Sequence, residues 1–115
     1  MNAMHRLHNR KAAPAMLKIL VLATVSFISC SSFANQALAQ KNNCMGCHAV
    51  GVKLVGPAFK DVAAKYAGQS DASDRLVESV RNGSVGKWGD MPMPAHPDLS
   101  TADAKKIVAW VLRAK

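Results

Sequence analysis

The chain is poor in aromatic and acidic side chains. Its 115 residues include three phenylalanines, two tryptophans, one tyrosine, seven acidic residues and three cysteines. No basic run is interleaved with aromatic residues, so nothing points to a nucleic-acid partner. No stretch of useful length alternates apolar and polar residues, as a half-buried strand would. The sequence therefore predicts an all-α fold.

The acidic residues are also unevenly placed, because all seven follow residue 60. The first 18 residues carry four basic residues and no acid, and an apolar stretch, ILVLATVSFISC, comes next. This order is typical of a secretory leader, and the Ala-Leu-Ala sequence that ends at residue 39 supplies a cleavage pattern. We predict a cleaved signal peptide over residues 1–39, one domain over residues 40–115 and a bacterial periplasmic location.

Lipidation and membrane insertion are two alternative fates of the leader. Cys30 ends the apolar stretch and would be the lipidated first residue of a lipoprotein, but the residues before it lack the leucine expected three positions back. We therefore expect Cys30 to leave with the leader. The apolar stretch is also short for a membrane-spanning helix, so no stable membrane insertion is expected.

The mature part is mildly basic and small. Four of the 15 basic residues precede residue 40, which leaves 11 basic against 7 acidic residues. A domain of this size buries little apolar surface and often needs a disulfide, a metal or a cofactor to complete its core.

Three mature segments have the periodicity of amphipathic helices. The first ends before Gly68, the second ends at Asn82-Gly83, and the third opens with a capping-box spacing between Ser100 and Asp103. A further short helix is expected around the cysteines at 44 and 47. The predicted buried positions are Phe59, Val62, Ala63, Tyr66, Leu76, Val77, Val80, Ala104, Ile107, Val108 and Val111.

The sequence NNCMGCHAV places Cys44, Cys47 and His48 at i, i+3 and i+4, which share one face of a helix. A zinc site would need four ligands, and only His96 remains to complete it. A redox Cys-x-x-Cys normally follows a strand of a β-α-β unit, which this sequence does not predict. Covalent haem attachment uses all three residues, two thiols for thioethers and an imidazole for the iron.

A sixth iron ligand would come from the long segment over residues 83–99, which is broken by glycines and prolines. A connection this long in a small domain usually has a function. Its candidates are Met91, Met93 and His96. We favour Met93, because Pro92 and Pro94 flank it and restrict the backbone that carries it.

Five segments in this order resemble the small single-haem class I cytochromes c of the bacterial cytochrome c-551 type. They are CMGCHAV, LVGPAFKDVAAKYAG, RNGSVGKWG, MPMPAHP and AWVL. The resemblance implies about four short helices wrapped around one covalently bound haem c. It implies Cys44 and Cys47 as thioether anchors, His48 as proximal ligand and Met93 as distal ligand.

The resemblance also implies two supporting roles. The carbonyl of Pro57 would accept the other ring N–H of His48, and Trp88 would contact a haem propionate. The chain departs from the family pattern at two positions. His96 stands where an asparagine is common, and Met91 where an aliphatic residue is usual.

With both axial positions filled, the predicted function is electron transfer and not enzymatic catalysis. The implied partners are a respiratory cytochrome complex and a periplasmic reductase, peroxidase or terminal oxidase, with the protein acting as a monomer. Lys53, Lys60 and Lys87 form either a rim that steers acidic partners or ordinary solubilising charge. The alternative function is a haem-based sensor or small peroxidase with a labile distal methionine.

Overall fold

The computed structural model describes residues 30–115, so the part of the predicted leader over residues 1–29 lies outside the described residues. Five helical elements follow one another along the chain. They are α1 (Cys30–Lys41), the 3₁₀ turn η1 (Cys44–Gly46), α2 (Phe59–Tyr66), α3 (Ala72–Asn82) and α4 (Thr101–Val111). Within residues 30–115 the only β-type pairing is one isolated bridge, so the predicted all-α fold is confirmed.

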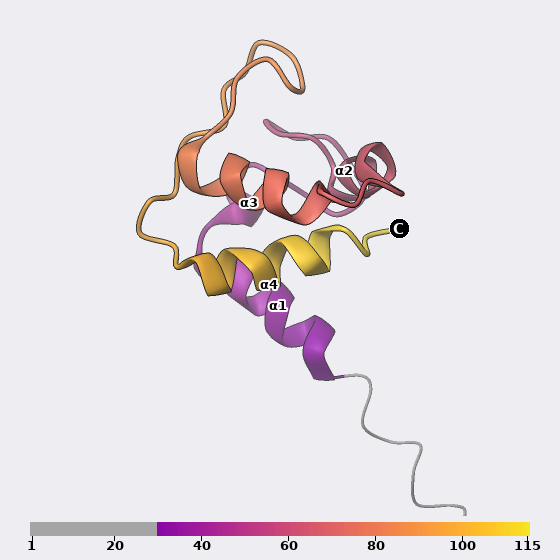
Figure 1. The fold of residues 1–115 in the computed structure, drawn as a ribbon, viewed down its shortest axis with the longest axis vertical. Coiled ribbons are helices and arrows are strands. Elements are labelled where there is room, and N and C mark those ends of the chain that lie inside the picture. Colours follow the sequence, from indigo (N-terminus) through magenta and orange to yellow (C-terminus); the bar gives the residue numbers. More distant parts are fainter. Residues whose placement is uncertain (1–29) are drawn as a thin grey trace, which may run out of the picture.

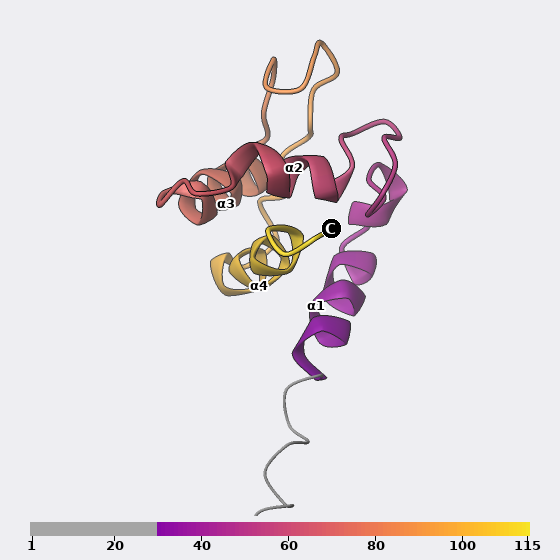
Figure 2. The ribbon, with the colours of Figure 1, turned by 90° about the vertical axis from the view of Figure 1, so that its right-hand side faces the viewer.

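Helix α4 lies at the centre of the arrangement. It packs against α3 along one side, and α1 crosses it on the other side (Figures 1 and 2). Helix α2 also contacts α4. The core consists of buried side chains from all four helices and the last loop: Ala39, Phe59, Val62, Tyr66, Ala72, Leu76, Val77, Leu99, Ala104, Ile107, Val108 and Val111.

The three helices predicted by periodicity are found where expected. Nine of their eleven predicted core residues are buried, whereas Ala63 and Val80 are only half-buried. Gly68 has a φ of +75°, the left-handed conformation that follows many helix ends. The hydroxyl of Ser100 caps α4 by accepting the backbone N–H of Asp103 at 3.1 Å.

The short helix predicted around the cysteines is replaced by a tighter turn. Asn43 has a φ of +59°, which separates α1 from η1. Only Cys44–Gly46 is helical, with 3₁₀ geometry. The backbone N–H groups of Cys47 and His48 both donate to the carbonyl of Cys44, at 3.2 and 3.0 Å. The three motif residues thus share one closed turn, although not a regular α-helix.

Helix α1 was not predicted, because its residues were assigned to the leader and its cleavage pattern. The predicted boundary after Ala39 falls inside this helix. Ala39 is fully buried there, and α1 packs extensively on α4.

The segment over residues 83–99 projects from the helices in both views (Figures 1 and 2). Its two arms are joined by an antiparallel bridge in which Ser84 and Met93 exchange two backbone hydrogen bonds, at 3.1 and 2.9 Å. The N–H of His96 donates to the carbonyl of Val80 in α3 at 3.0 Å. Within residues 30–115, no helix has the length and hydropathy required to cross a bilayer.

Candidate functional site

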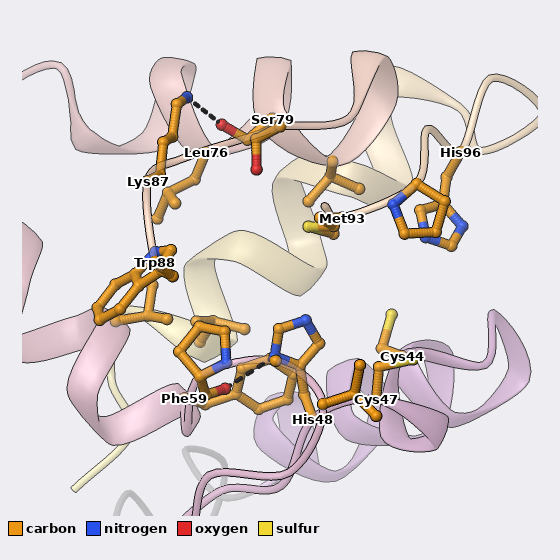
Figure 3. Close-up of a pocket in the computed structure, with 18 of the residues that line it drawn as sticks. Cys44, Cys47, His48, Phe59, Leu76, Ser79, Lys87, Trp88, Met93 and His96 are labelled. Atoms are coloured by element: carbon orange, nitrogen blue, oxygen red, sulfur yellow. Dashed lines mark hydrogen bonds between the residues drawn. The ribbon is translucent and has the colours of Figure 1, made fainter. Parts of the chain in front are cut away.

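A cavity of about 250 Å³ opens between the cysteine turn, α2, α3, α4 and the projecting segment (Figure 3). All six residues that the sequence singled out for the site line this cavity: Cys44, Cys47, His48, Pro57, Trp88 and Met93. Most of the remaining wall is apolar, and the three helices contribute Phe59, Leu76 and Ile107 among others.

His48 is held by its backbone turn and by one ring hydrogen bond. Its Nδ1 lies 2.8 Å from the carbonyl oxygen of Pro57. A carbonyl can only accept, so Nδ1 carries the proton and Nε2 of the neutral ring keeps its lone pair. The imidazole also stacks on Phe59, with ring centroids 5.0 Å apart and planes 18° apart. Trp110 supports Phe59 in turn through an edge-to-face contact of 5.3 Å.

Gly56 is a site residue that sequence reasoning missed. A Cβ at this position would lie 2.4 Å from Cε1 of His48, closer than two carbon atoms approach in proteins. Only glycine therefore leaves room for the imidazole in this orientation. The sequence feature that could have pointed to Gly56 is the Gly-Pro pair before Phe59, but such a pair is also consistent with an ordinary turn.

The two thiols lie beside His48 on one side of the cavity (Figure 3). Neither is in a disulfide; Cys44 is half-buried and Cys47 is exposed. Burial raises the pKa of the Cys44 thiol, more than a backbone hydrogen bond lowers it. Before haem attachment, burial therefore favours the protonated form of the Cys44 thiol.

Met93 projects into the cavity from the side opposite His48 (Figure 3). The bridge to Ser84 fixes its backbone, and Gly83 allows the close approach of the two arms. A Cβ on Gly83 would lie 2.8 Å from the carbonyl oxygen of Met93. Met91 also borders the cavity, but 63% of it is exposed. His96 lines the same cavity.

A polar cluster surrounds Trp88, which lines the cavity. The ammonium of Lys65 lies 4.2 Å from the centroid of the indole and donates to the carbonyl of Lys87 at 2.8 Å. The ammonium of Lys87 donates to the hydroxyl of Ser79 at 2.7 Å. Of these residues, the sequence singled out only Trp88 and Lys87. Lys65 and Ser79 occupy ordinary positions of amphipathic helices, so no pattern distinguishes them.

The donor set fits a covalently bound haem. Two free thiols and an imidazole with an available Nε2 stand on one side, and a neutral thioether faces them across an apolar cavity. Among residues 30–115, no three His, Cys, Asp or Glu side chains gather closely enough to hold a bare metal ion. Lys53 and Lys60 are exposed and do not line the cavity.

An all-helical domain in which a Cys-x-x-Cys-His turn lines an apolar cavity is typical of a small c-type cytochrome. The chain belongs to the cytochrome c family: the family model described as Cytochrome c matches residues 34–115. The protein therefore carries a covalently bound haem c with its iron, and it is an electron-transfer protein and not an enzyme.

Several relatives are similar over most of their length. Cytochrome c-551 of Allochromatium vinosum is 48% identical over 89 residues, which cover 77% of this chain and 95% of the relative. Cytochrome c-552 of Nitrosomonas europaea is 50% identical over 82 residues, 71% of this chain and 80% of the relative.

Solved structures agree with the fold. The crystal structure of wild-type Nitrosomonas europaea cytochrome c552 matches with a TM-score of 0.68 and 50% identity, covering 70% of this chain and 99% of that one. The class 1 cytochrome MtoD of Sideroxydans lithotrophicus ES-1 matches with a TM-score of 0.59 and 32% identity, covering 70% of this chain and 91% of that one.

Proposed function

We propose that the protein is a periplasmic one-electron carrier whose haem c iron is held by His48 and Met93. The observation that carries this proposal is the hydrogen bond from His48 Nδ1 to the Pro57 carbonyl, because it leaves Nε2 as the donor available to a metal. The thioether of Met93 on the other side of the same cavity supplies a second ligand. When bound at this site, haem c would supply one-electron redox chemistry.

The protein's own residues orient the ligands and exclude water. Pro57 and Phe59 fix the plane of the imidazole, and the hydrogen bond to Pro57 makes Nε2 a stronger donor. A neutral thioether favours the ferrous state and raises the reduction potential. The apolar wall from α2, α3 and α4 lowers the local dielectric and has the same effect.

The Met93 backbone is restrained by the Ser84 bridge as well as by its two prolines. A restrained ligand moves little between oxidation states, which suits rapid electron transfer. The same restraint opposes release of Met93, the event that the alternative sensor or peroxidase function requires. His96 favours this alternative, since it lines the cavity three residues from Met93.

We further propose that export precedes function and that the partners are redox proteins. The sequence of the leader supports the periplasmic location. A respiratory cytochrome complex would donate electrons, and a periplasmic reductase, peroxidase or terminal oxidase would accept them. Exposed Lys53 and Lys60 would steer acidic partners to a monomeric carrier through weak, salt-sensitive contacts.

The visible spectrum of the reduced holoprotein tests the proposal. A carrier whose iron is held by both His48 and Met93 should keep its spectrum when carbon monoxide is added. A sensor or peroxidase with a labile methionine shows a new carbon monoxide spectrum under the same conditions. The second result would contradict the carrier proposal while leaving the covalent haem in place.

A further inference from the structure

The two ends of helix α1 differ in how deeply their side chains are buried. Ser32, Phe33 and Ala34 are exposed, and Phe33 is exposed by 75%. Towards the other end, Leu38 packs against the core and Ala39 is fully buried. The packed end of this helix therefore behaves as part of the folded domain, whereas the stretch over residues 32–34 does not.

The packed end of α1 also supports the turn that presents the cysteines. The backbone N–H and the side-chain amide of Asn42 both donate to the carbonyl of Leu38, at 3.1 and 2.8 Å. The N–H of Asn43 donates to the carbonyl of Gln40 at 3.0 Å. Cys44 follows directly, so its position depends on the last turns of α1.

Cleavage after Ala39 would remove this support. Only Gln40 and Lys41 of the helix would remain, and two residues cannot close a helical turn. The buried contacts of Leu38 and Ala39 would be lost, and a domain this small has only a small hydrophobic core. The carbonyl that accepts both hydrogen bonds of Asn42 would also be lost.

A second cleavage pattern lies five residues earlier. Ser32 and Ala34 are small residues separated by one position, and they follow the apolar stretch more closely than Ala37 and Ala39 do. The family match also begins at residue 34. Hydrolysis at this point would retain residues 35–41, which include the whole packed end of α1.

We propose that the leader is removed between Ala34 and Asn35, so that the mature protein begins at Asn35. Water adds across this peptide bond, leaving a carboxylate on Ala34 and an amine on Asn35, and the enzyme is a signal peptidase of the exporting cell. The bond lies within α1, so hydrolysis precedes folding of this end of the domain. The inference rests on the proposed export and differs from the boundary after Ala39 that the sequence alone suggested.

Intact mass and N-terminal sequencing of the haem-loaded protein, exported from a bacterium that matures c-type cytochromes, test the inference. The expected product is residues 35–115 plus one haem. A product of residues 40–115 plus haem would overturn the inference but leave the export proposal standing. A lipid on Cys30 would overturn the inference, and an uncleaved chain would contradict the export proposal itself.

Two matched variants test the inference further. Each replaces one exposed alanine of α1. Ala34→Gln should block or displace cleavage, whereas Ala37→Gln should leave the product mass unchanged apart from the substitution. The opposite pattern, with cleavage lost only in Ala37→Gln, would show that the later site is used. Both variants keep Leu38 and Ala39, so neither removes the packed contacts of α1.

Discussion

His48 and Pro57 are joined by a hydrogen bond of 2.8 Å from the imidazole Nδ1 to the backbone carbonyl. Pro57 lies near the end of the loop that follows His48, and Gly56 of the same loop lies against the imidazole ring. The loop therefore fixes the orientation of the imidazole and leaves no room for a side chain at position 56. Nε2 is left to face the cavity with its lone pair.

Gly56→Ala should disturb His48 directly. A methyl group 2.4 Å from Cε1 forces the ring to move, and overpacking of this kind costs about 1–3 kcal/mol. We expect a lower free energy of unfolding and an altered visible spectrum of the holoprotein. Gly51→Ala is the matched control, because a Cβ there meets nothing within 4 Å. Equal effects of the two variants would contradict a specific role for Gly56.

Gly83→Ala should disturb Met93 through the backbone. Gly83 has a φ of 78° and a ψ of 172°, a region that costs a side chain about 1–3 kcal/mol. Its Cβ would also push on the Met93 carbonyl. Gly86→Ala has a similar φ but open space around the Cβ. Thermal unfolding and the methionine-to-iron absorption band should both change more in Gly83→Ala; the reverse order would count against the bridge as a restraint on Met93.

Ser100→Ala should destabilise the domain by about 1 kcal/mol, the usual value of an N-cap. The hydroxyl of Ser100 accepts the Asp103 N–H, which otherwise has no partner at the helix start. Denaturant unfolding measures the effect. Ser70→Ala, at an exposed serine before α3, should change the free energy of unfolding by less.

Asp103 links stability to pH. A hydrogen bond from Lys106 at 3.0 Å is the largest influence that holds the pKa of Asp103 below its ordinary value. Because the folded pKa is the lower one, this interaction stabilises the fold above the unfolded pKa and is lost as pH falls through the folded pKa. In Lys106→Ala, an NMR titration should find a higher pKa for Asp103. Lys105→Ala should leave it nearly unchanged, and an unshifted pKa in Lys106→Ala would disprove the assignment.

The parts of the fold that the sequence predicted are those with a strong local signal. The stripes of α2, α3 and α4 follow the helical repeat, and Ser100 marks the start of α4. Helix α1 was missed because Ala37 and Ala39 match a cleavage pattern as well as a packed helix. Burial of Ala39 depends on α4, which lies far away in the sequence.

The residues that the sequence predicted for the site all line one cavity, but the contacts that support them were not predicted. Cys44, Cys47 and His48 form a specific short motif, and Met93 stands between two prolines. The Ser84–Met93 bridge leaves no alternating pattern, because a single bridge needs no strand. The contact of Gly56 with His48 depends on a loop closing over the ring, which local propensity does not encode.

The most direct test of the account is a redox titration of Met93→Ala and Met91→Ala, each recorded with its visible spectrum. Both variants should keep covalent haem, because Cys44 and Cys47 are intact. Met93→Ala should lose the methionine-to-iron band and have a markedly lower reduction potential, whereas Met91→Ala should keep the band and a potential close to that of the wild type. A normal band and potential in Met93→Ala would contradict the account.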